Sequence, residues 1–307
     1  ETGVLIPELE PLDAHLQLAK AWRMLGFVSG AVCRWGDQVQ AVQRALEHAR
    51  LAGDQRLEAR LAAAYTIGLR DGPTTVPEAI MRCSEIIERR LPDRQAEAIA
   101  TASLACLLAM DGDFTGARRS YREAGSLLAD LGGVTLAAFA AIAAARVELL
   151  SDDPAAAERE LAPVFADLGR LGERYFRPLV GAFLARTVQL QERSDEAQLI
   201  AAEASADADP DDVETQALLG CVQATMLSRA GEHQGALAAV EDALDRVLAT
   251  DSPPLQAGVI YDSAMLLARA GRVEEANAAL ASAHALYEAK GDVVSAARLA
   301  ALRQFAI

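Results

Sequence analysis

The sequence has 307 residues, of which 52% are hydrophobic and 5% aromatic, and it lacks the alternating β-branched runs that strands require. Its formal net charge of −15, from 44 acidic and 29 basic residues, excludes a surface suited to nucleic acid or to an anionic membrane. The composition predicts an all-α protein.

Small residues recur at a regular spacing along the chain. Gly231 is followed five residues later by Ala236 and seven further on by Ala243, and Gly271 starts the same spacing again. Such residues let neighbouring helices approach closely, and the pattern is similar to that of tetratricopeptide-like helix pairs. One marker alanine opens the second helix of each predicted pair, at steps of 38 to 40 residues: Ala41, Ala79, Ala117, Ala157, Ala197, Ala236 and Ala276.

The repeat predicts a single domain over residues 4–307, folded as a right-handed TPR-like α-superhelix of about seven antiparallel helix pairs. Residues 1–3 have the composition of a cloning leftover. A final single helix at residues 293–305 is expected to cover the apolar face of the last pair. In chain order, the pairs are residues 13–52, 54–91, 94–131, 134–171, 173–206, 212–249 and 254–290.

Turn residues divide each pair into two helices. In the first pair we place the turn at Gly36 and Asp37, and in the second an irregular link at residues 71–77. The residue seven positions before each turn should lie at the close contact between the two helices, where a bulky side chain would cost about 1–3 kcal/mol. These contact positions are Ser29, Ala105, Ala145, Ala185, Ala224 and Ala264.

The sequence contains no phosphate-binding loop, dinucleotide fingerprint, zinc-protease motif or nucleophile elbow, so we expect neither catalytic residues nor a cofactor. Carboxylates between Asp207 and Glu214 are numerous enough for calcium, but helix capping explains them better than a metal site. No apolar run is long enough to span a membrane, which favours a cytoplasmic protein. Four dispersed cysteines are expected in the core, and four histidines are expected to be isolated at the surface or at its boundary: Cys33, Cys83, Cys106, Cys221, His15, His48, His233 and His284.

The candidate binding residues lie in first helices, which line the concave groove of tetratricopeptide-like arrays. Arg146 and Arg186 are forty residues apart and therefore occupy the same position in consecutive repeats, where they could clamp a carboxylate. Gln189, Tyr261 and Met265 fall at comparable groove positions. The alternative is that each arginine pairs internally, with an acid such as Glu148 or Glu158.

Six segments carry a family resemblance: residues 15–23, 45–54, 72–83, 153–161, 210–216 and 286–298. They resemble the C-terminal tetratricopeptide-like region of actinobacterial regulators in which a cyclase domain precedes a STAND-type ATPase. The resemblance covers nearly the whole chain and implies a sensor arm that restrains or releases an upstream ATPase. Two departures are residues 192–195, where a glycine turn is expected, and Arg177–Pro178, which interrupts a first helix.

We therefore expect a non-enzymatic interaction and regulatory module that binds a protein, a peptide or a small effector in its groove. The upstream ATPase or cyclase domains of the same polypeptide are its expected partners. A free-standing peptide-binding scaffold, self-associating as a homodimer through the last repeats, is one alternative. An enzyme built on an α-superhelix is another.

Overall fold

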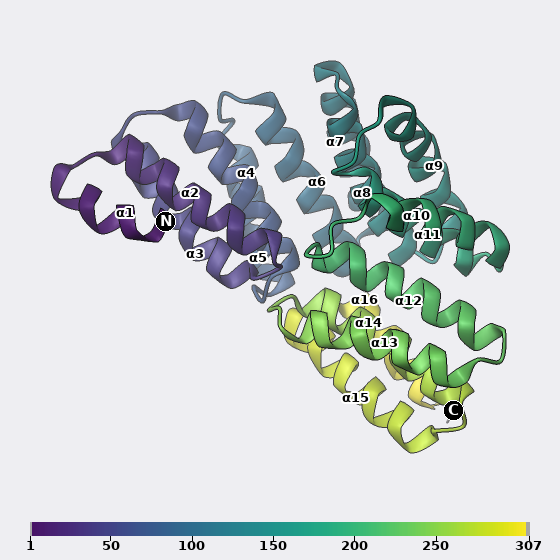
Figure 1. Cartoon of the computed structure of the whole chain (residues 1–307). Helices are drawn as coiled ribbons and strands as arrows, with labels where there is room; N and C mark the ends of the chain where they lie inside the picture. The colour runs from purple at the N-terminus through teal and green to yellow at the C-terminus, as the bar shows by residue number, and fades with distance from the viewer. Residues whose placement is uncertain (1, 305–307) are drawn as a thin grey trace.

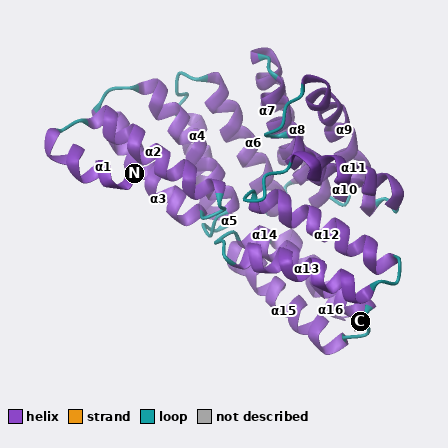
Figure 2. Cartoon of the chain, in the orientation of Figure 1, coloured by secondary structure: helices purple, strands orange, loops and turns teal. Residues whose placement is uncertain are grey.

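The computed structural model describes the backbone of residues 2–304 and the side chains of residues 6–302. In this part of the chain, sixteen α-helices and one short 3₁₀ helix follow one another, without a strand (Figure 2). The elements are α1 (Thr2–Leu9), η1 (Glu10–Leu12), α2 (His15–Ala31), α3 (Trp35–Leu51), α4 (Gln55–Asp71), α5 (Val76–Glu88), α6 (Arg94–Met110), α7 (Phe114–Leu131), α8 (Val134–Leu150), α9 (Pro154–Leu171), α10 (Arg177–Leu190), α11 (Ser194–Asp207), α12 (Val213–Arg229), α13 (His233–Leu248), α14 (Pro253–Arg269), α15 (Val273–Lys290) and α16 (Val293–Gln304).

Helices α2 to α15 form seven antiparallel pairs that stack into one curved array (Figure 1). The first helices of the pairs, from α2 to α14, make the inner wall. Helix α16 packs on the last pair through Leu299, which joins a cluster with Leu280 and Ala283. The expected tetratricopeptide-like solenoid is therefore confirmed, whereas the short helix α1 was not predicted.

Between α4 and α12, aspartates begin five of the helices by the same local mechanism. Each side chain accepts a hydrogen bond from the backbone N–H three residues later, which satisfies a donor that the first helical turn leaves free. One of them is Asp212, in the acidic segment considered for calcium, and it caps α12 through Thr215. The capping aspartates are Asp54, Asp93, Asp113, Asp153 and Asp212.

The turn inside each regular pair contains one residue with positive φ. In the last two pairs this residue is the predicted Gly231 or Gly271. Pair five uses Glu192 at φ 64°, so the expected departure from glycine is real and the turn still forms. In the same pair, Arg177 and Pro178 do not interrupt a helix but begin α10, which is consequently shorter than its counterparts.

The turn of the first pair was predicted three residues too far along the chain. Its positive-φ residue is Cys33, at φ 55°, and Gly36 lies in the first turn of α3. Counting back seven residues from Cys33 gives Gly26, not Ser29, as the close-contact position. A Cβ on Gly26 would lie 2.9 Å from Val42 Cγ2, so this position has the steric requirement predicted for Ser29.

The predicted contact alanines of the other pairs are confirmed as core residues. All five are fully buried, so helices meet there with one methyl group per residue between the backbones. The five are Ala105, Ala145, Ala185, Ala224 and Ala264.

Gly181→Ala should destabilise the fold. A Cβ at Gly181 would lie 2.7 Å from Ala204 Cβ and 2.7 Å from Phe165 Cε2, so α10 would have to move from both neighbours. We expect a loss of about 1–3 kcal/mol in unfolding free energy, measured by chemical denaturation. Gly125→Ala is the control: its Cβ meets no described atom within 4 Å, and the change should stabilise α7 by up to about 1 kcal/mol. Equal effects of the two changes would contradict this account of the packing.

Candidate functional site

Both groove arginines are held by acids from other repeats. The Arg146 guanidinium contacts Asp71 Oδ1 through Nη1 at 3.2 Å, and its Nη2 donates to Glu214. Arg186 donates to both carboxylate oxygens of Asp262, with Nη2 to Oδ1 at 3.0 Å. Internal pairing, the alternative interpretation of the sequence, is thus observed, and each partner lies on another first helix.

The acids suggested as partners from the sequence are engaged elsewhere. Glu148 accepts hydrogen bonds from Arg118, at 2.6 Å from Nη2, and from the hydroxyl of Tyr121 at 2.9 Å. Glu158 accepts from Arg193 at 2.7 Å. Glu148 pairs with residues of α7, and Glu158 pairs with Arg193 in the α10–α11 turn. The prediction of Glu148 or Glu158 as partners was wrong because proximity in sequence does not determine which face of a helix a side chain occupies.

The remaining candidate residues are less available than expected. Gln189 is buried, and its Nε2 donates to the Val222 carbonyl at 2.9 Å, which ties α10 to α12. Tyr261 and Met265 are half-buried on α14. Of the five candidates, the structure brings only Arg146 and Arg186 together, in one small cavity of about 170 Å³.

This central cavity is lined by both ends of the array. Trp35 comes from the first pair and Asp71 from the second, whereas Ser252 and Val259 come from the link and helix after α13. The array is therefore curved enough for its last repeats to contact its first ones.

The N-terminal end of helix α3 is contacted by an acid from the far end of the chain. Asp251 accepts hydrogen bonds from the backbone N–H groups of Trp35, at 2.5 Å, and Gly36, at 2.8 Å. Ser252 donates its hydroxyl to the carbonyl of Asp71 at 2.8 Å. These contacts join residues more than 180 positions apart in sequence.

The C-terminal end of helix α4 is contacted by a buried lysine. Lys290, at the end of α15, has no solvent-exposed surface. Its ammonium donates to the carbonyls of Leu69, Gly72 and Thr74 at 2.8, 2.7 and 2.6 Å. We call the hydrogen bonds made by Asp251, Ser252 and Lys290 the closure contacts.

Charges at this junction perturb one another. Burial alone would raise the pKa of Asp71, but Arg70 and Arg146 hold it at about 2, so the carboxylate stays ionised. Burial raises the pKa of Glu214, and Arg146 opposes that shift. Burial lowers the pKa of Lys290 to about 8, with Asp71 opposing the change. Asp71 is thus the acid that stabilises the positive charges of Arg70, Arg146 and Lys290.

A wider groove opens on the inner wall beside the central cavity. It has a volume of about 580 Å³ and lies between α2, α4 and the start of α6, with Tyr175 from the α9–α10 link also lining it. Its apolar lining includes Phe27, Ile67 and Ile99. Trp35 lines both this groove and the central cavity, so the two spaces share one side chain.

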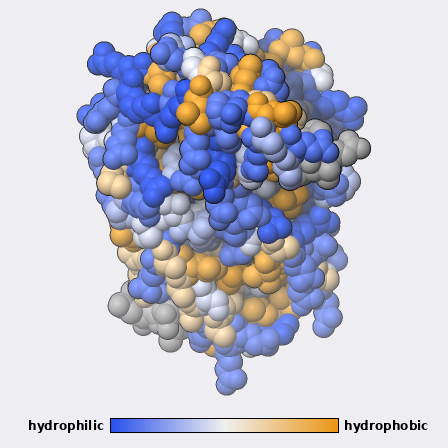
Figure 3. Space-filling model, turned by 90° about the vertical axis from the view of Figure 1, so that its left-hand side faces the viewer, coloured by the Kyte–Doolittle hydropathy of each residue, from blue (hydrophilic) through white to orange (hydrophobic). Residues whose placement is uncertain are grey.

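The groove carries unusually exposed apolar surface and basic groups. Phe27 is 62% exposed and Tyr175 68% exposed. Arg23 lines the groove and forms no ion pair with another described residue, while Arg60 is half exposed and contacts Asp93 at 3.1 Å. Figure 3 faces the N-terminal end of the array, where apolar patches interrupt a mostly hydrophilic surface. Sequence reasoning missed this groove, although the apolar Met24, Phe27 and Val28 with Arg23 indicated an apolar, basic helix face.

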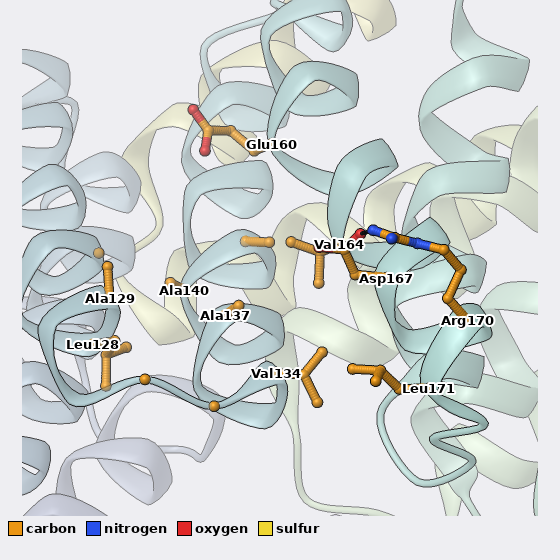
Figure 4. Close-up of a pocket in the computed structure, with 14 residues that line it drawn as sticks. Leu128, Ala129, Val134, Ala137, Ala140, Glu160, Val164, Asp167, Arg170 and Leu171 are labelled. Atoms are coloured by element: carbon orange, nitrogen blue, oxygen red, sulfur yellow. Dashed lines mark hydrogen bonds and ion pairs between the residues drawn. The ribbon is translucent and has the colours of Figure 1, made fainter.

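A second groove lies on the outer side, between α7 and α9 with α8 as its floor (Figure 4). Its volume is about 650 Å³, and it is lined mainly by small residues of α7 and α8. Arg170 at its edge is paired with Asp167, as the dashed line in Figure 4 shows. Apart from Glu160, the charged residues that line the outer groove are therefore paired with each other.

The remaining reactive side chains form no catalytic arrangement that we recognise. His15 and His48 were expected to be isolated, but their rings stack and their Nδ1 atoms lie 3.1 Å apart. All four cysteines are buried and free, as expected of core residues. Among the described residues there is no cluster of metal ligands, and none of their helices is long and apolar enough to cross a membrane.

Comparisons with known proteins identify the fold. No family model and no curated protein matches the sequence. Among solved structures, the apo form of RapI has a TM-score of 0.64 at 11% identity, over 88% of this chain and 98% of that one. NprR in complex with its cognate peptide NprX has a TM-score of 0.59 at 12% identity, over 87% and 82%.

A third solved structure is a STAND protein with a tetratricopeptide repeat sensor from Pyrococcus horikoshii. Its TM-score is 0.58 at 10% identity, and the match covers 96% of this chain but 50% of that protein. At these identities the likeness establishes the tetratricopeptide-like fold.

Arg146→Ala should lower stability, because it leaves Glu214 without an ion-pair partner among the described residues and leaves Asp71 with Arg70 alone. Breaking a buried pair from one side costs about 3–5 kcal/mol, and we expect a thermal or chemical unfolding experiment to show a loss of this order. Arg170→Ala is the control, since Arg170 is 77% exposed and its loss should change stability by less than about 0.5 kcal/mol. A loss for Arg146→Ala no larger than for Arg170→Ala would contradict this role.

Proposed function

We propose that the protein is a non-catalytic interaction and regulatory module that recognises a peptide or protein segment in the groove between α2, α4 and α6. One observation carries the proposal: exposed Phe27 and Tyr175 lie beside Arg23 and Arg60 on the concave wall. Apolar surface of this kind, rimmed by polar groups, is typical of binding sites rather than of a solvated face.

The groove also defines the chemistry of its ligand. Burying an aromatic side chain such as Phe27 contributes about 1.5–3 kcal/mol, so Phe27 and Tyr175 supply affinity. Arg23, which pairs with no acid among the described residues, attracts a carboxylate, although the chain as a whole carries a charge of −15. The ligand that fits is a short segment with apolar side chains and at least one acid.

Proteins of the same fold support recognition as the role. The structure of NprR was solved with its cognate peptide, and that of a Rap protein with the Competence and Sporulation Factor. The Pyrococcus horikoshii protein is described as a STAND protein with a tetratricopeptide repeat sensor. The resemblance to cyclase and STAND-ATPase regulators adds the proposal that this region is the cytoplasmic sensor arm of a longer polypeptide.

In this proposal Arg146 and Arg186, which were predicted to clamp a ligand, have a structural role instead. Because Arg146 and Arg186 are paired with acids on other first helices, they hold the inner wall together and leave recognition to the groove. Tyr261 and Met265 lie on α14, outside the groove lining, and Gln189 is buried within the wall.

Selection of a displayed random-peptide library on the intact protein tests the proposal. Recovered peptides should combine apolar and acidic residues and bind with lower affinity to Phe27→Asp, by at least tenfold. This factor corresponds to about 1.4 kcal/mol, which is less than the full contribution of one buried aromatic residue. Titration calorimetry with the recovered peptides measures the change.

Leu199→Asp provides the matched control. Leu199 is 68% exposed on α11, outside the groove lining, so it receives the same substitution without touching the proposed site. Peptides that bind wild type, Phe27→Asp and Leu199→Asp equally would show that the groove is not the recognition surface.

A further inference from the structure

The closure contacts place two opposite charges at two helix ends. Asp251 lies at the N-terminal end of α3, where backbone N–H groups and the helix dipole favour a negative charge. Lys290 lies at the C-terminal end of α4, where free carbonyls favour a positive charge. Both helices belong to the first two pairs, and both charges come from the end of the array.

The closure contacts differ from the contacts within the array. Consecutive pairs share hydrophobic clusters, for example one that joins Val180 on α10 to Leu218 on α12. Among the described residues, however, no such cluster joins the first two pairs to the last two. A junction held by hydrogen bonds and charge, without a shared apolar core, can separate at lower cost than the pairs themselves, because water replaces its partners.

The junction is connected directly to the groove. Asp251 binds the backbone N–H of Trp35, and the side chain of Trp35 lines both the central cavity and the groove. A change in the position of Asp251 therefore acts on a residue that any groove ligand would contact.

We propose that the two ends of the array separate and rejoin as a conformational switch, and that the closure contacts hold the groove in its closed-array shape. The part of this proposal that concerns the groove rests on the proposed function. In the closed state Lys290 and Asp251 complete the ends of α4 and α3. In the open state water takes their place, and Trp35 loses its support from the last repeats.

Distance measurements between spin labels test the separation without any ligand. The native cysteines are buried, so cysteines introduced at the exposed positions Glu85 on α5 and Ala289 on α15 can be labelled selectively. Wild type should give one short distance. Lys290→Met and Asp251→Asn should each add a longer distance at the expense of the short one, with the helical circular dichroism unchanged.

The chain contains the matched control, because Lys20 is its other lysine and is exposed on α2. Lys20→Met should leave the distance distribution as in wild type. If Lys290→Met does not fold, Asp251→Asn decides the matter, since asparagine keeps the volume of the side chain and removes its charge. Folded Lys290→Met and Asp251→Asn proteins with the wild-type distance would overturn the proposal.

Acrylamide quenching of Trp35 tests the link to the groove. Replacing Trp22, whose buried indole N–H has no partner, by phenylalanine makes Trp35 the single tryptophan. In this background, Asp251→Asn should raise the quenching constant at least twofold, and Lys20→Met should not. If the ends separate but the quenching of Trp35 does not change, the link to the groove is wrong and the separation of the ends is still supported. Peptide binding by Phe27→Asp tests only the proposed function.

Discussion

The array depends on close packing of the two helices within each pair, because this packing gives every repeat the same compact shape. At Ala105, Ala145 and Ala185 a single methyl group separates the backbones, and at Gly26 not even that. Close approach at one position of every pair is repeated along the chain, so its geometric effect accumulates. The accumulated rotation brings residues 251 and 290 within hydrogen-bond distance of α3 and α4. Contacts between the two ends thus follow from the rotation that accumulates over the intervening repeats.

The curvature also divides the inner wall into two parts. At the central cavity, Arg146, Asp71 and Glu214 face one another, and a buried charge is tolerated only when such partners are present. Further towards the N-terminus, α2 has no preceding pair at its side in the described chain, and Phe27 stays exposed. The charged part stabilises the shape of the array, and the apolar part is free for a ligand.

The repeats could be predicted from the sequence because their signals are local. Glycine in a turn and an alanine five residues later are both set by backbone sterics within one pair. The turn at Cys33 escaped prediction because a non-glycine residue takes the positive φ there, while the nearby Gly36 suggested a different position. The partners of Arg146 and the environment of Lys290 could not be predicted, since a repeat period fixes neighbours in the array but not how far the array closes.

In the proposed switch, ligand binding and closure involve the same residue. Trp35 lines the groove, and the closure contacts hold Trp35 by its backbone, so a ligand that touches Trp35 shares a contact with closure. Two events that share a contact influence each other's equilibrium reciprocally, whichever comes first. If a ligand fits the groove better when Asp251 is engaged, it favours the closed array; if it needs Trp35 to move, it favours the open one. In both cases, the proposed switch would let occupancy of a groove near the first repeats alter the position of the last repeats.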